Sequence, residues 1–180
     1  MKYIEEYIKN LKEMKLLSQD LRNLLEDMKN KNELINNINL MTAFLLLDKT
    51  LLTIKSMLKI LPYSTYDKSE QKDWDISSVA ALVRNIIENY NMFFYLVVEE
   101  VDKVEKDLRQ DLCELHSFVE KLKMYESLGI DKETMDLQEK NIETIKNRIM
   151  KNTLFKKFSY EKRKNILKGD RVFYFSKWLL

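Results

Sequence analysis

The sequence predicts an all-α fold, a bundle of five to six helices, from three observations. Only two glycines, Gly129 and Gly169, and one proline, Pro62, occur in 180 residues, where average usage gives roughly twelve and nine. Tight turns and glycine-rich loops need residues that reach a positive φ or arrive with φ already fixed. Apolar residues also recur every three or four positions over long stretches, which is the period of an amphipathic helix.

A first helix is expected over about residues 2–29. Its apolar side chains alternate between spacings of three and four, a heptad seam interrupted only by Ser18. Leu17 and Leu24 are expected to widen this apolar stripe. The seam consists of Ile4, Tyr7, Leu11, Met14, Ser18, Leu21, Leu25 and Met28.

A turn is expected within the Asn-rich residues 30–39, and a second helix from about Asn32 or later to Leu61. The helix is expected to end there because Pro62 disfavours helical geometry in the residue before it. Two seams of about 28 residues predict an antiparallel hairpin about 40 Å long at 1.5 Å per residue. A second apolar row is formed by Met41, Leu45 and Leu52. The seam itself consists of Leu40, Phe44, Leu47, Leu51, Ile54, Leu58 and Leu61.

A third helix is expected from Ile76 to about Glu99, after a loop over residues 63–75. Asp75 is a candidate N-cap, with Trp74 and Val79 placed as a hydrophobic staple. Because this segment is apolar nearly all round, we expect it to be the central, buried helix.

Three further helices are expected in the remainder of the chain. The fourth runs from about Asp102 to Leu128 and ends at Gly129, a residue favoured just past a helix end. Asp131 is expected to cap a fifth, to about Lys151, and Ser159 a short sixth that stops at Gly169. The tail, residues 172–180, is expected to be a strand or an extended docking arm.

We expect one domain over residues 1–180, made of the hairpin 1–61, central helices 76–151 and a basic, aromatic segment 152–180. The net charge of +2 with 45% apolar residues is a soluble profile. Cys113 is the only cysteine, which fits a reducing cytoplasm as the location. No N-terminal signal is expected, and no apolar run approaches the length of about 20 residues that a membrane span needs.

The composition excludes several chemistries. Phosphate-cradling loops need clustered glycines, and zinc sites need several cysteine or histidine ligands, whereas the chain has one of each. We therefore expect no metal and no cofactor, and any catalysis would use His116 with arginine, tyrosine and carboxylate side chains.

One polar stripe lies on the expected third helix, where Arg84, Glu88, Asn91 and Tyr95 are spaced i, i+4, i+7 and i+11. Burying a charge without a partner is costly, so Arg84 and Glu88 are expected to pair. The stripe is either a buried polar network that fixes helix register, or the wall of a polar pocket or dimer seam.

A second constellation lies on the expected fourth helix, where Arg109, Cys113, His116 and Glu120 share one face. Such a set could cleave RNA, with the imidazole as general acid or base and the guanidinium holding the scissile phosphate. The alternative is a partly exposed helix face with an ordinary histidine.

A third constellation is the basic C-terminal segment, because residues 141–180 carry 11 basic and 3 acidic side chains. Aromatic residues such as Phe155, Phe158 and Tyr160 interrupt the basic ones. The segment either packs its rings on the bundle, or binds nucleic acid or an acidic protein. The candidate binding residues are Lys151, Lys156, Lys157, Lys162, Arg163, Lys164, Lys168 and Arg171.

Residues 75–91, with the sequence DISSVAALVRNIIENYN, resemble uncharacterised prokaryotic helical proteins in which an Arg-x-x-x-Glu pair opens an aromatic-rich helix. The spacing from Arg109 to His116 is similar to the Arg-x4-6-His motif of the HEPN superfamily. The resemblance covers about residues 74–125. It implies a helical bundle, often dimeric, and in many members a metal-independent ribonuclease of toxin or phage-defence systems.

Three functions therefore remain open. The first is a non-enzymatic interaction or regulatory module, from a phage, mobile-element or defence system. The second is a HEPN-like ribonuclease that uses Arg109, His116 and Glu120, and the third is an RNA- or DNA-binding protein without catalysis. A homo-oligomer, and a protein or RNA partner, are expected in addition.

Overall fold

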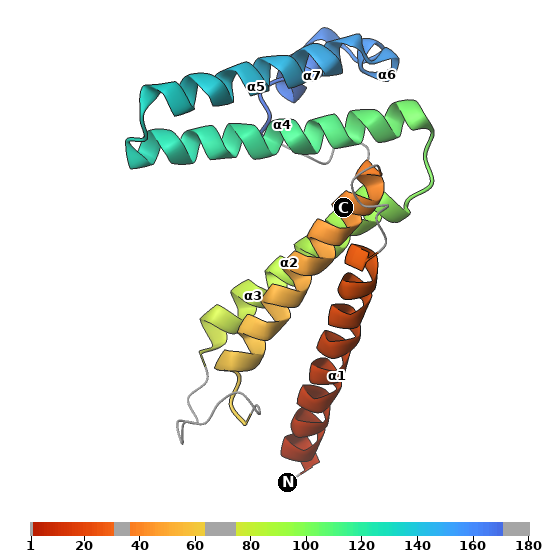
Figure 1. The fold of residues 1–180 in the computed structure, drawn as a ribbon, viewed down its shortest axis with the longest axis vertical. Helices are drawn as coiled ribbons and strands as arrows, with labels where there is room; N and C mark the ends of the chain where they lie inside the picture. The colour runs from red at the N-terminus through yellow and green to blue at the C-terminus, as the bar shows by residue number, and fades with distance from the viewer. Residues whose placement is uncertain (1, 31–36, 64–74, 171–180) are drawn as a thin grey trace. The chain divides into compact units, whose positions relative to one another are not determined.

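The computed structural model describes residues 2–30, 37–63 and 75–170 (Figure 1). Every regular element in these ranges is helical, with seven α-helices and one π-helical turn, which confirms the all-α fold. The chain divides into two compact units, Met1–Glu99 and Glu100–Leu180. The single domain over all 180 residues stays a prediction.

In the first unit, α1 (Lys2–Asn30) and α2 (Ile38–Ile60) form the expected antiparallel hairpin (Figure 1). At one end the Tyr7 hydroxyl donates to the Pro62 carbonyl oxygen at 2.8 Å. At the other end the Lys29 ammonium lies 5.4 Å from the centroid of the Phe44 ring. These two contacts lie at opposite ends of the hairpin, and they show that α1 and α2 run antiparallel.

The heptad seams face each other, as expected. Leu11, Ser18 and Leu25 of α1 are buried, as are Leu51 and Leu58 of α2. The expected wider stripes are wrong, because the unit covers only one face of each hairpin helix. The residues of these wider stripes are exposed, namely Leu17, Leu24, Met41, Leu45 and Leu52.

The third helix, α3 (Ile76–Phe93), lies against α2 (Figure 1). Asp75 caps it by accepting a hydrogen bond from the Ser78 amide, while Trp74 of the expected staple lies outside the described residues. The expectation of a central, buried helix is wrong, since Asn89 is the one residue of α3 that is buried. Only one side of α3 joins the core, and the side chains that do so are Val79, Leu82 and Ile86.

A π-helical turn, η1 (Phe94–Val98), ends the first unit and was not predicted. It closes with a hydrogen bond from the Glu99 amide to the Phe94 carbonyl, an i to i+5 bond of 2.8 Å. The wider turn leaves both Tyr95 and Leu96 buried.

The second unit is built on α4 (Lys103–Leu128) and α5 (Lys132–Lys151), which run antiparallel (Figure 1). Gly129 ends α4 with φ +64°, and Asp131 caps α5, as expected. Arg148 of α5 pairs with Asp111 and Glu114 of α4. The core holds Leu108, Leu112, Leu115, Ile142, Ile145, Ile149, Phe155 and Ile166.

Two short helices complete this unit. α6 (Thr153–Lys156) was not predicted and is capped by Asn152, whose side chain accepts from two amides. α7 (Tyr160–Ile166) is capped by Ser159, as expected. The tail over residues 172–180 lies outside the described residues. Within the described ranges, no helix has the length and hydropathy needed to cross a membrane.

Candidate functional site

Arg109 lies in the interior of the second unit. Its side chain is 2% exposed, and its guanidinium donates to a Glu105 carboxylate oxygen from Nε at 2.9 Å and from Nη2 at 2.5 Å. A buried charge is stable only when it is paired and hydrogen-bonded. The contacts therefore give Arg109 a structural partner one turn earlier on α4.

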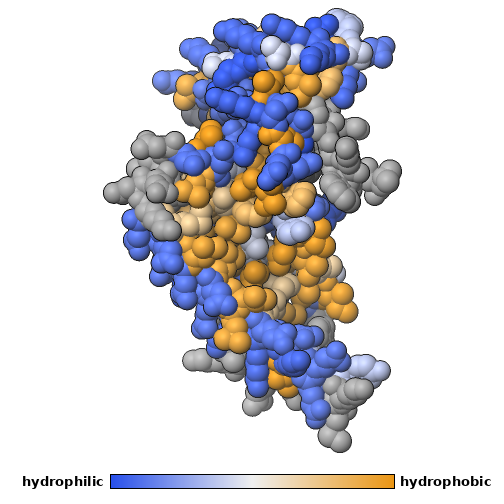
Figure 2. Space-filling model, turned by 90° about the vertical axis from the view of Figure 1, so that its right-hand side faces the viewer, coloured by the Kyte–Doolittle hydropathy of each residue, from blue (hydrophilic) through white to orange (hydrophobic). Residues whose placement is uncertain are grey.

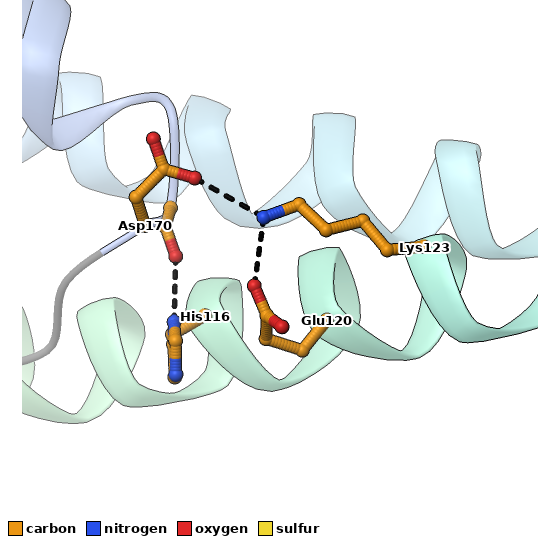
Figure 3. Close-up of polar contacts among 5 residues, drawn as sticks. His116, Glu120, Lys123 and Asp170 are labelled. Atoms are coloured by element: carbon orange, nitrogen blue, oxygen red, sulfur yellow. Dashed lines mark hydrogen bonds and ion pairs between the residues drawn. The ribbon is translucent and has the colours of Figure 1, made fainter.

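His116 also lies on α4 and faces the end of α7 (Figure 3). Its Nδ1 lies 2.7 Å from the carbonyl oxygen of Gly169. Because a carbonyl oxygen can only accept, Nδ1 carries the proton in this contact. The imidazole thus holds the chain just beyond α7 against α4.

Gly169 is required for this close approach. Its φ is +74°, and a Cβ added there would lie 2.7 Å from Val119 Cγ2 and 3.2 Å from Leu115 Cγ. The sequence marked Gly169 as a helix stop but gave no sign that its Cα rests on α4.

Glu120 and Lys123 extend the same group of contacts (Figure 3). The Lys123 ammonium donates to Glu120 Oε1 at 2.8 Å and to Asp170 Oδ1 at 3.3 Å. The bond from Lys123 lowers the pKa of the Glu120 carboxyl, and the bonds to Glu120 and Asp170 raise the pKa of Lys123. We call His116, Glu120, Lys123, Gly169 and Asp170 the α4 clasp.

The clasp brings two of the three candidate catalytic residues, His116 and Glu120, into one cluster. The Arg109 guanidinium, two turns before His116, is occupied by Glu105 inside the unit. The catalytic roles of all three residues stay predictions. Within the described ranges, no group of three or more histidine, cysteine or acidic side chains is placed to hold a metal ion.

The polar stripe on α3 is divided by the fold. Arg84 Nε and Glu88 Oε1 form the expected pair at 2.8 Å. The expected buried network is wrong, because these side chains are 81% and 57% exposed and Asn91 is exposed as well. Tyr95, by contrast, is buried in η1. The Arg84–Glu88 pair is therefore a surface ion pair.

Beside this pair, α3 presents an apolar stripe that the sequence analysis missed. Ile76, Val83, Ile87 and Tyr90 are 71%, 40%, 55% and 65% exposed, and Ala80 between them is exposed too. Their spacings are four, three, four and three, the same signal that defined the hairpin seams. We call these five residues the α3 stripe. Figure 2 views this unit from the side of α1 and shows hydrophobic side chains at its surface there.

The basic segment packs its first rings inward. Phe155 is 3% exposed and meets Phe158 edge to face at a centroid distance of 6.4 Å. The Lys162 ammonium lies 4.1 Å from the centroid of the Phe158 ring. Of the candidate binding residues, Arg163 is half-buried, Arg171 lies outside the described residues, and the six lysines between 151 and 168 are exposed.

Comparison with known proteins gave no matching family model, no similar curated protein and no similar solved structure. The HEPN resemblance therefore stays a prediction, and the fold and contacts alone support the function proposed below.

Proposed function

We propose that the protein is a non-enzymatic helical interaction module that pairs with a second copy of itself through the α3 stripe. The observation that carries this proposal is the exposure of 40–71% at four large apolar side chains in heptad spacing. Large apolar patches on soluble proteins mark interaction sites. Among the described residues of the first unit, none covers this face, as the exposure of its side chains indicates.

The shape of the stripe favours a helix as its partner. From Ile76 to Tyr90 it extends about 21 Å at 1.5 Å per residue. A straight row with alternating spacings of three and four is the seam by which one helix packs on another.

Four of the five residues of the stripe, all but Ile76, are complementary to themselves in an antiparallel register. A twofold axis that crosses the stripe at the level of residue 85 sets Ala80 opposite Tyr90 of the other copy, and Val83 opposite Ile87. The smallest side chain thus faces the largest, which keeps the distance between helices even along the stripe. An interface of this kind is isologous, as in most soluble dimers.

The charges beside the stripe fit the same register. The axis places Arg84 of one copy and Glu88 of the other within about 3 Å of each other along the helix direction, at 1.5 Å per residue. Both side chains are exposed, so their pairing favours this register more than it adds affinity.

The position of the stripe on α3 leaves room for the second copy. At about 100° per residue, the centre of the stripe lies about 90° around the helix from the centre of the face with Val79, Leu82 and Ile86. That face packs on the core of the first unit. Near-perpendicular faces are those used in four-helix packing, so two α2–α3 pairs can associate without displacing α2.

Sedimentation equilibrium of the full chain tests the proposal. Burial of half-exposed Ile87 in both copies contributes about 2 kcal/mol, so Ile87→Lys weakens the dimer at least about thirtyfold in Kd. The matched control, Asn85→Lys, adds the same charge on the opposite side of α3 and leaves the Kd unchanged. A monomeric wild-type chain, or equal weakening by both variants, would overturn the proposal.

The absence of catalysis in this proposal is supported by the contacts of the candidate residues. Arg109 is buried with Glu105, and His116 is bonded through Nδ1 to Gly169. The alternative is the metal-independent ribonuclease, which would cleave RNA in EDTA. A role in a phage, mobile-element or defence system, and a cytoplasmic location, belong to the same proposal.

A further inference from the structure

The segment with α6 and α7 is hydrogen-bonded to α4 at both of its ends. At its start, the Asn152 side-chain amide donates to the Val104 carbonyl of α4 at 2.9 Å. At its end, His116 bonds to the Gly169 carbonyl. The backbone between these two contacts is therefore anchored to α4 at both ends.

The inner side of this segment is apolar. Phe155 and Ile166 are buried, and Leu154, Phe158 and Leu167 pack against the core of the second unit. The charged side chains consequently point away from the core. Together with Lys151, the last residue of α5, five exposed lysines of this segment form what we call the α6–α7 surface, namely Lys151, Lys156, Lys157, Lys162, Lys164 and Lys168.

The charge of this surface is of one sign. Residues 151–168 contain seven lysine or arginine side chains and one acidic residue, Glu161, a net charge of +6. Within the described ranges, Lys151, Lys156 and Lys164 form no ion pair with any carboxylate. Their charge is available to an anionic partner.

We infer that the α6–α7 surface binds the phosphate backbone of double-stranded nucleic acid. Lysine acts as a point charge toward phosphate and carries no base specificity. Base stacking needs exposed rings, whereas Phe155 is buried and Phe158 is half-buried, with the Lys162 ammonium over its ring. Tyr160, 73% exposed, is the one described ring of this segment that is open to solvent.

Other anionic partners fit this surface less well. Protein interfaces rely on aromatic, apolar and arginine side chains and are depleted in lysine. A membrane-bound amphipathic helix inserts its apolar face into lipid, but the apolar side of this segment is used in the core. A phosphate backbone requires only the cations.

The salt dependence gives the expected size of the effect. Each phosphate contact contributes about −0.9 to the slope of log K against log salt for duplex nucleic acid. Five contacts give a slope of about −4.5. At 0.15 M salt this relation means that each lysine–phosphate contact increases the binding constant about fivefold. Removal of three lysines therefore weakens binding about a hundredfold.

The test uses the full chain and fluorescently labelled 20-base-pair duplexes of DNA and of RNA, with arbitrary sequence. The triple variant K151Q/K156Q/K164Q should lose about a hundredfold in affinity and about 2.7 units of salt slope. The control K103Q/K132Q/K140Q removes three exposed lysines of the same unit, which lie among acidic residues, and should bind as the wild type does. Circular dichroism checks that both variants are folded.

Binding of either duplex with these losses supports the inference. Four results would overturn it: no duplex binding at low salt, equal losses in both triple variants, tighter binding of the single strand than of its duplex, or equal binding of polyglutamate or phosphatidylserine vesicles. The inference does not depend on self-association, because its residues lie in the second unit and the α3 stripe lies in the first.

Discussion

Replacement of Gly169 by alanine tests how closely the C-terminal segment packs against α4. The left-handed backbone, with φ +74°, costs an alanine about 1–2 kcal/mol. The added Cβ would lie 2.7 Å from Val119 Cγ2. Such a steric overlap in a packed core costs about 1–3 kcal/mol more. Gly169→Ala should therefore lower the free energy of unfolding by about 2–5 kcal/mol.

Gly129→Ala is the matched control for this change. Gly129 also has a positive φ, +64°, but a Cβ there meets nothing within 4 Å. Only the backbone cost of about 1–2 kcal/mol applies, and the effect of the substitution on the unfolded chain is common to both positions.

Urea unfolding followed by circular dichroism compares the two variants, which lie in the same unit. We expect Gly169→Ala to be less stable than Gly129→Ala by about 1–3 kcal/mol. Equal losses of stability would refute the close contact between Gly169 and α4.

Three further predictions concern single side chains of the second unit. Arg109→Ala should lower the free energy of unfolding by about 3 kcal/mol, because it breaks a buried ion pair; a loss below about 1 kcal/mol in urea unfolding would contradict that burial. His116→Ala should cost about 1 kcal/mol by losing its hydrogen bond, and neither it nor the wild type should cleave RNA in EDTA. Wild-type cleavage that leaves 2′,3′-cyclic phosphate ends and disappears in folded His116→Ala would instead establish the ribonuclease. Hydrogen bonds from Thr134 lower the pKa of Asp131. The ionised Asp131 carboxylate therefore contributes its full stabilisation above about pH 3.9, and this stabilisation is lost as the pH falls through the lowered pKa. Asp131→Asn keeps the cap and should lose less stability than the wild type between pH 7 and about pH 3 in urea unfolding.

Local signals made most helix ends predictable. Asp75, Asp131 and Ser159 cap the helices that they were expected to cap, and Gly129 ends α4. Each of these residues acts through a hydrogen bond or a backbone angle of its own segment, which the sequence encodes directly. The π-helical turn at Phe94 has no comparable signal, because it depends on how the chain leaves α3.

Burial was predicted less well, because it depends on the number of neighbouring helices. The apolar character of α3 predicts burial on all sides, yet Ile76 and Tyr90 are 71% and 65% exposed. The heptad spacing of the α3 stripe was visible in the sequence. Whether such a seam meets another helix of the same chain is a property of the fold.

The candidate site shows the same limit. The helical spacing placed Arg109 and His116 on one side of α4, and the sequence suggested a shared phosphate site. The structure gives them different partners, Glu105 four residues away and Gly169 fifty-three residues away. The second contact joins distant parts of the chain, and no local pattern encodes it.

Disulfide cross-linking between copies tests the central claim most directly. In a Cys113→Ser background, V83C and I87C chains are oxidised separately and as a mixture. The account predicts a mixed disulfide dimer in the mixture and little dimer in either sample alone, because identical positions are offset by about 6 Å along the helix. Equal cross-linking of V83C with itself, or no cross-link in the mixture, would contradict the antiparallel pairing of α3.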